Sequence, residues 1–329
     1  MALAYPASAV AIVEAMFFEC QFMRAITRFF QFPFFILAFW SSLATAQTLS
    51  LTFDDGLNPD TQADARLWNQ QILDTLKGSD ITAMVFPALV RVGGSDGKGL
   101  ALISDWSKAG HAVGNHTATH QSLASSKLSL NDFVADVKAA DGVLRRFPSW
   151  EPMLRFPYLK EGDTLEKRDG MRAWMKANGY RPAPVSIDAS DWYFNQIYAA
   201  QMKAGDADKA VKVKAAYVEH LLNRAAYYDG LAKQVTGRSP QHVMLLHTSQ
   251  INAAALADIV AAFKARGWTF VSPLQAFKDS LYGVQTNTLP AGESIVWAMA
   301  KEQGVAALRY PAEDSVYEES GLREAGLLP

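Results

Sequence analysis

Two adjacent carboxylates, Asp54 and Asp55, stand directly after an apolar run, and Gly56 follows them with the freedom to make a sharp turn. Like charges so close together are costly unless a cation or a base shares the site. The same pattern is typical of an ordinary Asp-Gly turn after a strand. The pair alone is therefore a weak indication of catalysis.

His116 and His120 are four residues apart, which is one helical turn, so both imidazoles would reach one point if the segment coils. Two histidines and one carboxylate form a recurrent catalytic zinc set that leaves a position open for water. The alternative is a pair of surface or capped histidines. The chain has only 6 histidines, and two of them at ligand spacing after an apolar run favour the metal site.

Polar residues also end three later apolar runs. Arg155 carries a guanidinium that is always charged and would orient a neighbouring aspartate, although a surface salt bridge is equally common. Asp188 and Asp191 precede Trp192, which is either a sugar-stacking wall or a core residue. His247 follows another apolar run, where a lone histidine is more often a core residue than a catalyst.

The elements that must position these residues alternate along the chain. We expect strands at residues 48–53, 82–87, 111–114, 153–156, 184–188, 242–246 and 269–271, and helices at 61–77, 100–108, 130–146, 164–178, 211–235 and 253–266. This alternation predicts parallel strands with outer helices, in an open doubly wound sheet or a β/α barrel. Seven strands favour an incomplete or distorted (β/α) barrel. In both architectures functional sites gather at the C-terminal ends of the strands, where the polar residues fall.

In order and kind, these motifs resemble the five motifs of the polysaccharide deacetylase family, carbohydrate esterase family four, also called the NodB homology domain. The resemblance runs from Thr52 through His247 and more loosely toward Leu274. It departs at residues 57–59, since proline commonly follows the first-motif glycine directly. It departs again at the helical segment 197–237. This segment would be either a lid over the groove or a pair of covering helices, and we favour the covering helices because helical packing is the commoner use.

The resemblance implies a role for each residue of the metal and base motifs. A divalent metal, usually zinc, would be bound by Asp55, His116 and His120. Asp54 would be the general base that deprotonates the attacking water. Arg155 would orient Asp54.

The resemblance also implies the acid and the substrate groove. His247 would be the general acid that protonates the leaving amine, and Asp191 would support its protonated form. The backbone amide of Tyr158 would help hold the oxyanion. Trp192 and Leu245 would line the groove for the sugar and the acetyl methyl group. Because the base must be deprotonated and the acid protonated together, activity should follow a bell-shaped pH profile.

These residues together predict a metal-dependent hydrolase that removes acetyl groups from an N-acetylated glycan, such as peptidoglycan or chitin-like oligomers. One alternative is an O-acetyl esterase that acts on xylan-like glycans. A third is a glycan-binding protein that kept the fold and lost turnover, against which the complete set of motif residues argues. The chain has 329 residues, a net charge of −2 and a pI near 6.3, so it has no basic field of the kind that nucleic-acid binders need.

Residues 1–46 have the pattern of a leader with a signal peptide. Arg24 and Arg28 precede the apolar run 29–40, and small residues end at Ala46, after which we expect cleavage. The apolar run is shorter than the roughly 20 residues of a membrane span, and Met23 is the expected true start. We therefore expect one exported catalytic domain, 47–329, with a C-terminal tail, no stable membrane span, and a periplasmic or extracellular location. Cys20, the only cysteine, precedes this domain, so a metal must use histidine and carboxylate.

Overall fold

The computed structural model describes residues 47–311 and 316–328. The expected leader, with its start at Met23 and its cleavage site after Ala46, lies outside these residues. In the part of the chain that is described, no helix is both long enough and apolar enough to cross a membrane.

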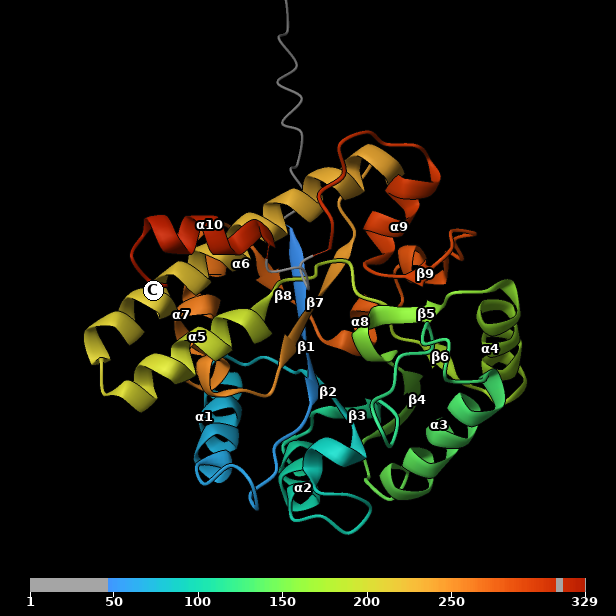
Figure 1. Cartoon of the computed structure of the whole chain (residues 1–329), viewed down its shortest axis with the longest axis horizontal. Helices are drawn as coiled ribbons and strands as arrows, with labels where there is room; N and C mark the ends of the chain where they lie inside the picture. The colour runs from blue at the N-terminus through green and yellow to red at the C-terminus, as the bar shows by residue number, and fades with distance from the viewer. Residues whose placement is uncertain (1–46, 312–315, 329) are drawn as a thin grey trace, which may run out of the picture. The chain divides into compact units, whose positions relative to one another are not determined.

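A parallel sheet forms the centre of the described chain (Figure 1). Its 7 strands are β1 (Thr48–Asp55), β2 (Met84–Pro87), β3 (Ala112–Asn115), β4 (Trp150–Leu154), β6 (Arg181–Pro182), β7 (Gln241–His247) and β8 (Thr269–Phe270). The strand order is β6-β4-β3-β2-β1-β7. β7 pairs with one edge of β1 along nearly its whole length. On the other edge, β8 pairs with the start of β1 and β2 pairs with its end. β1 is buried along most of its length, as expected of a parallel strand covered on both faces.

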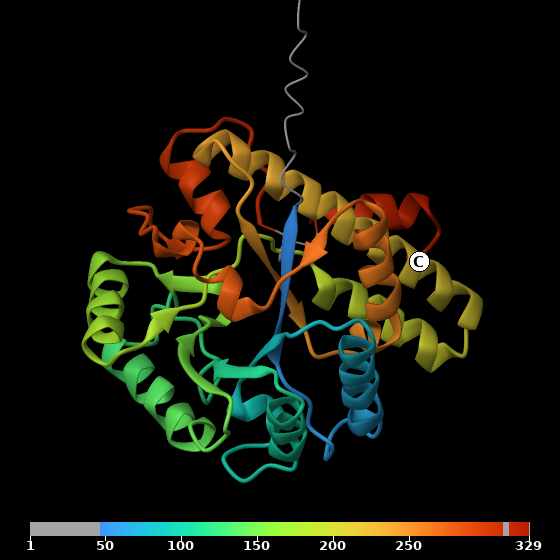
Figure 2. The same ribbon diagram turned by 180° about the vertical axis from the view of Figure 1, so that it is seen from behind.

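Helices surround the strands, as the two opposite views in Figures 1 and 2 show. They are α1 (Ala65–Gly78), α2 (Gly99–Lys108), α3 (Leu130–Leu144), α4 (Leu165–Ala177), α5 (Asp191–Ala204), α6 (Ala207–Thr236), α7 (Gln250–Ala265), α8 (Pro273–Ala276), α9 (Ile295–Glu302) and α10 (Val316–Glu324). Ser129, Thr164 and Ser249 cap α3, α4 and α7 by accepting a hydrogen bond from the backbone N–H three residues later. β5 (Lys160–Gly162) and β9 (Ala291–Gly292) form a separate antiparallel pair.

Residues 183–187 connect the two ends of the parallel sheet. The N–H of Ala183 donates to the carbonyl of Leu154 beside β4, and Ile187 forms a parallel bridge with Met244 of β7. A continuous strand over residues 184–188 was expected, and that prediction was wrong, because the strand is Arg181–Pro182 and only the single bridge follows it. Pro184 has no N–H to donate to a ladder. The predicted incomplete, distorted barrel is confirmed.

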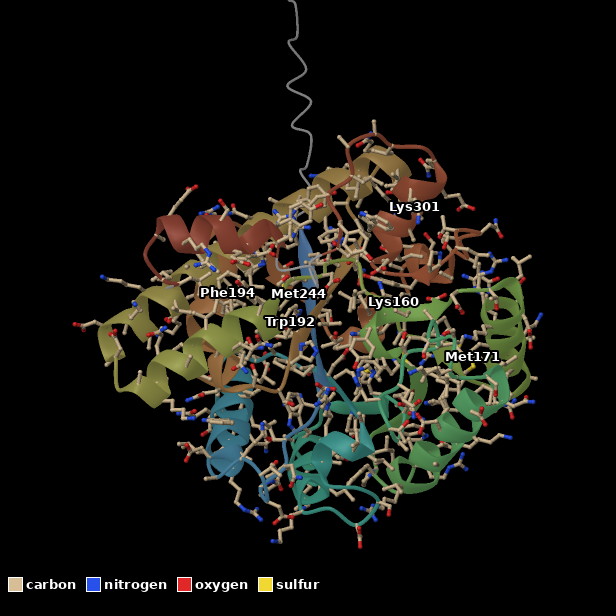
Figure 3. The ribbon with its side chains drawn as sticks, in the orientation of Figure 1. Lys160, Met171, Trp192, Phe194, Met244 and Lys301 are labelled. Atoms are coloured by element: carbon tan, nitrogen blue, oxygen red, sulfur yellow. The ribbon has the colours of Figure 1, made fainter. Side chains whose placement is uncertain are left out.

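The segment 197–237 is a pair of covering helices and not a separate lid. α6 is 30 residues long and buries Val213, Tyr217, Leu221 and Tyr228 in the main core. Phe194 of α5 packs its ring against Tyr217, with a centroid distance of 5.4 Å, and Figure 3 shows it between α5 and its neighbours. The apolar side chains that these helices bury account for their stable position over β7.

Gly114 of β3 allows a ring beneath the polar end of the sheet to pack closely. A Cβ atom at Gly114 would lie 2.4 Å from Cε1 of Phe86, and the guanidinium carbon of Arg155 lies 4.7 Å from the centroid of that same ring. We expect Gly114→Ala to lower the free energy of unfolding by about 1–3 kcal/mol, because the added methyl group overpacks the core. Urea denaturation measures this change.

A matched control is Gly142→Ala in α3, since a Cβ atom there meets nothing within 4 Å. We expect this variant to be as stable as the wild type or more stable by up to about 1 kcal/mol, because alanine is the better helix former. An unchanged stability of the Gly114→Ala variant would contradict the packing argument.

Candidate metal centre and active site

The end of β1 presents its two carboxylates to different surroundings. Asp54 pairs in register with His247 of β7 on one side and with Phe86 of β2 on the other. The next residue, Asp55, has a φ of 75°, in the left-handed region that aspartate tolerates better than most residues. Asp54 is 1% exposed, whereas the side chain of Asp55 is 21% exposed. Both aspartates line the same pocket, but the carboxylate of Asp54 is buried and that of Asp55 is partly exposed.

The two histidines meet through a turn that side chains cap, and not through a helical turn as the spacing had suggested. The N–H of Thr117 donates to Oδ1 of Asn115, and the N–H of His120 donates to Oγ1 of Thr117. Thr117 and His120 have φ values of 70° and 57°. The imidazole centroids of His116 and His120 lie 4.8 Å apart. Asn115, a buried residue, is thus a positioning residue of the site.

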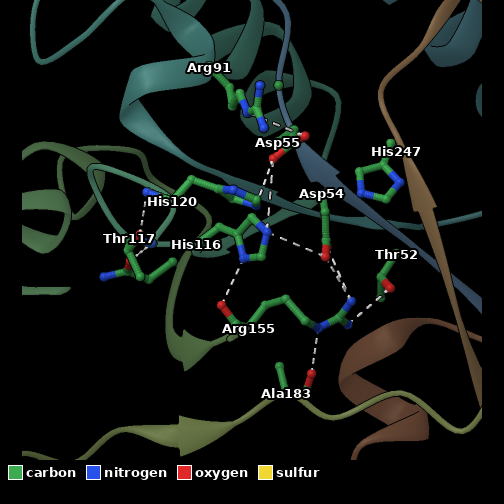
Figure 4. Close-up of polar contacts among 12 residues, drawn as sticks. Thr52, Asp54, Asp55, Arg91, His116, Thr117, His120, Arg155, Ala183 and His247 are labelled. Carbon is green, nitrogen blue, oxygen red and sulfur yellow. Dashed lines mark hydrogen bonds and ion pairs between the residues drawn. The ribbon is translucent and has the colours of Figure 1, made fainter. Parts of the chain in front are cut away.

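Asp55, His116 and His120 form a possible metal site, with one ligand atom from each within 4.8 Å of the others. Nε2 of His120 lies 3.3 Å from Oδ1 of Asp55, and Nε2 of His116 lies 4.0 Å from the same oxygen (Figure 4). In the described part of the chain, Oδ1 of Asp55 is buried without a hydrogen-bond partner. A buried carboxylate oxygen without a donor is well suited to a cation.

The protonation of the histidines also fits a metal. Burial lowers the pKa of His116 and of His120 to about 4, so both rings are neutral near pH 7. Neutral imidazole is the form that binds metals. Nδ1 of His116 lies 2.8 Å from the carbonyl oxygen of Arg155, and donation to this oxygen leaves Nε2 as the ligand atom. The residues present therefore match the requirements of a divalent metal.

Arg155 holds the buried carboxylate of Asp54. Its Nη1 lies 3.2 Å from both carboxylate oxygens, Nη2 donates to Oγ1 of Thr52, and Nε donates to the carbonyl of Ala183. Burial raises the pKa of Asp54 to about 6, although the positive charge of Arg155 opposes this effect. Asp54 is therefore an anion near pH 7 and a stronger base than an ordinary aspartate.

Asp191 holds His247 on the other side of the pocket. Oδ1 of Asp191 lies 2.7 Å from Nδ1 of His247, and Oδ2 accepts the backbone N–H of His247 and the side-chain amide of Asn252. Burial by itself would lower the pKa of His247, but the charge and hydrogen bond of Asp191 raise it to about 10. His247 is thus a cation near pH 7. Asn252 was not predicted, because a single buried polar residue in the first turn of a helix has no distinctive spacing.

Asp54, Asp55, His116, His120 and His247 line one pocket of about 900 Å³. Tyr158 is 54% exposed at its edge, and its ring centroid lies 4.8 Å from that of His120. Trp192, in the first turn of α5, and Leu245 of β7 also line the pocket. Trp192 lies near the middle of the view in Figure 3. The structure thus brings all ten predicted site residues together.

The pocket has further lining residues that the sequence patterns did not indicate. They are Asn58, Gln62, Trp68, Arg91, Asn195, Gln196 and Gln250. They come from the loop after β1, from α1, from the short 3₁₀ helix η1 (Leu89–Val92) and from the N-terminal parts of α5 and α7. None of them stands at a strand end, so the positions of the apolar runs do not indicate them.

Comparison with known proteins shows which family the chain is similar to. The family model described as polysaccharide deacetylase matches residues 43–182. The chain is 26% identical to a peptidoglycan-N-acetylglucosamine deacetylase of Bacillus cereus over 239 residues, which cover 70% of this chain and 69% of that protein. It is 25% identical to a polysaccharide deacetylase of Bacillus cereus with a crystal structure, over 69% of this chain and 91% of that one, with a TM-score of 0.50.

A mutant of a pseudoenzyme of carbohydrate esterase family 4 shares the fold, with 14% identity, 71% coverage of this chain, 68% of that one and a TM-score of 0.50. The residues that the family model matches include the predicted metal set and both members of the Asp54–Arg155 pair. The sequence motifs, the parallel barrel and these comparisons agree: the chain is similar to the polysaccharide deacetylase family, whose model matches residues 43–182.

Proposed function

We propose that this protein is a metal-dependent hydrolase that removes acetyl groups from N-acetylated sugars of a glycan, with GlcNAc-containing peptidoglycan or chitin-like chains as its substrates. One observation carries the proposal. A buried anion, Asp54, and a cation, His247, lie in the same pocket as the Asp55–His116–His120 set. Hydrolysis of an amide needs a base for water and an acid for the amine, and these two side chains meet both needs.

Asp55, His116 and His120 would hold the metal. When bound, a divalent metal such as zinc supplies a Lewis acid that polarises the acetamide carbonyl and makes water more acidic. Zinc is proposed because two histidines and one carboxylate are among its usual catalytic ligand sets. The described residues offer this set without a thiolate.

The chain's own residues carry the proton transfers. A carboxylate oxygen of Asp54 takes a proton from the attacking water while Arg155 keeps the carboxylate in place. Nδ1 of His247 is bound to Asp191, so Nε2 donates the proton to the amide nitrogen as the carbon–nitrogen bond breaks. The products are acetate and a free amine on the sugar. We assign to the backbone N–H of Tyr158 the hydrogen bond that stabilises the negatively charged carbonyl oxygen in the transition state.

The walls of the pocket support a carbohydrate as the substrate. Indole faces such as those of Trp68 and Trp192 pack well against the apolar faces of sugar rings. The pocket also has five side-chain amides, which both donate and accept hydrogen bonds and thus match sugar hydroxyls and acetamido groups: Asn58, Gln62, Asn195, Gln196 and Gln250. This combination favours a glycan over a small apolar amide.

Acetate release tests the proposal. The zinc-loaded protein is incubated separately with N-acetylated chitooligosaccharide, peptidoglycan and O-acetylated xylan. Protein treated with a chelator serves as the control. We expect acetate from at least one of the N-acetylated glycans and none after chelation, with activity restored by zinc. Release from xylan alone would make the protein an O-acetyl esterase. Glycan binding without any release would make it a binding protein.

We also propose that the catalytic domain acts outside the cytoplasm, in the periplasm or the medium, after cleavage behind Ala46. The support is the order of charged, apolar and small residues in positions 24–46. Mass measurement of the secreted protein tests this proposal, since a product that retains residues 1–46 would contradict it.

A further inference from the structure

Arg91 is the only lysine or arginine among the described residues that line the pocket. It lies on η1, and its side chain is 50% exposed. Its Nε atom is 3.7 Å from Oδ2 of Asp55, whereas Oδ1 of Asp55 faces the two histidines. Figure 4 shows Arg91 and Arg155 on opposite sides of Asp55 and the histidines. The metal set thus has a second guanidinium beside it, at the exposed side.

The backbone of η1 is tied to the segments that carry the metal set. The N–H of Leu89 donates to the carbonyl of Thr117, and the N–H of Val90 donates to the carbonyl of Ala118. The N–H of Ala88 donates to the carbonyl of Asp55. These three hydrogen bonds join η1 to the end of β1 and to the turn that carries His116 and His120. Arg91 therefore has a defined position relative to the catalytic groups.

The contact between Arg91 and Asp55 leaves most of the guanidinium available. A separation of 3.7 Å is longer than a hydrogen bond, and half-exposed ion pairs contribute little. Arg155 differs, since its three nitrogens all donate to protein acceptors. The planar fork of an arginine suits a carboxylate, which it can bind through two parallel hydrogen bonds. A cation bound at Oδ1 of Asp55 would also offset the negative charge of this carboxylate and so weaken its attraction for Arg91.

We propose that Arg91 binds a carboxylate on the sugar next to the N-acetylated sugar, so that the preferred substrate is an acidic glycan. This inference rests on the proposed deacetylase function and narrows its substrate class. Arg91 faces Oδ2 of Asp55 and the histidines face Oδ1, so the guanidinium does not compete with a metal for the same oxygen. Arg91 then acts as a specificity-determining residue, because a neutral glycan lacks its partner.

A pair of matched substrates tests this role in the zinc-loaded protein. Peptidoglycan strands stripped of their peptides carry free lactyl carboxylates, and coupling of these groups to methylamine makes the same strands neutral. We expect kcat/KM to be about fivefold higher for the acidic strands, mainly through KM, as for a partly exposed ion pair. The preference should shrink as salt is added. Arg91→Gln should abolish the preference, and Arg91→Lys should keep part of it.

Arg181→Gln is the matched control. Arg181 is 51% exposed and pairs with Glu151 at 3.3 Å, but it does not line the pocket, so this variant should retain the preference. Equal kcat/KM for the two strands in the wild type would overturn the inference, as would a preference that persists in Arg91→Gln. Equal losses on both strands, with loss of bound zinc, would instead make Arg91 a positioning residue for Asp55.

A neutral chitooligosaccharide distinguishes failure of the proposed role of Arg91 from failure of the proposed deacetylase function. Acetate release from it, together with equal rates on the acidic and neutral strands, would overturn the role of Arg91 and leave the deacetylase function intact. Absence of acetate from every N-acetylated glycan would overturn the function, and the inference would fall with it.

Discussion

Replacement of Asp54 by asparagine is expected to lower kcat by about 10²–10⁴-fold, the usual contribution of a general base. The amide keeps the shape of the carboxylate but cannot accept a proton from water. Bound zinc should remain, because the metal set is Asp55, His116 and His120 and does not include Asp54. Acetate release and metal content, measured on the same preparation, test both halves of this expectation.

The control for this variant is Asp55→Asn, which should lose zinc because it weakens a ligand. If Asp54→Asn loses the metal and Asp55→Asn keeps it, the roles of the two aspartates are exchanged. Loss of Asp54 also leaves Arg155 buried without its carboxylate, which is expected to cost about 3–5 kcal/mol of stability. The rates must therefore be measured well below the unfolding temperature of each variant, as determined by circular dichroism.

The second large effect is a change in the pH profile on replacement of Asp191 by asparagine. In the wild type, activity should rise as Asp54 loses its proton near pH 6 and fall as His247 loses its proton near pH 10. A bound cation moves the lower limb to still lower pH, because it favours the anion of Asp54. Burial lowers the pKa of His247, and Asp191 opposes this most strongly, with further contributions from Asp55 and Asp54, so without Asp191 that pKa should fall well below 10.

His247 acts as an acid, so it must carry its proton for the enzyme to be active, and a lower pKa of His247 reduces activity at high pH. In the Asp191→Asn variant the upper limb should move down by several pH units, and at pH 8 little of the enzyme should have a protonated His247. We expect a loss of about 10²-fold or more at pH 8 and a smaller loss near pH 6. Acetate release from pH 5 to 10 measures both limbs. An upper limb that stays near pH 10 would rule out Asp191 as the cause of the raised pKa.

The chain contains a matched control for this experiment. Asp229 and His242 form a second buried aspartate–histidine pair, with Oδ1 of Asp229 at 3.2 Å from Nε2 of His242, and neither residue lines the pocket. Asp229→Asn should lower stability but leave the pH dependence of activity unchanged.

The sequence by itself determined most of the apolar runs that become strands and the chemical groups that follow them. Apolar runs are local signals, and a parallel barrel brings the C-terminal ends of its strands to one side. Asp54, His116, Arg155 and His247 follow from these two facts, because each stands at the end of an apolar run. Trp192 and Asp191 were also identified, although they begin α5 and do not end a strand.

Only the tertiary structure decided how these groups meet. The left-handed backbone of Asp55 and the turn capped by Asn115 depend on contacts with other segments, and no local periodicity encodes them. Asn252 reaches Asp191 across 61 residues of sequence, and Arg91 reaches Asp55 only because η1 is bonded to two loops. Such contacts are set by packing and hydrogen bonding between distant segments. The identity of the proposed catalytic groups could therefore be predicted from the sequence. Their orientation, and the contact of Arg91 on which the acidic-glycan proposal rests, could be seen only in the folded structure.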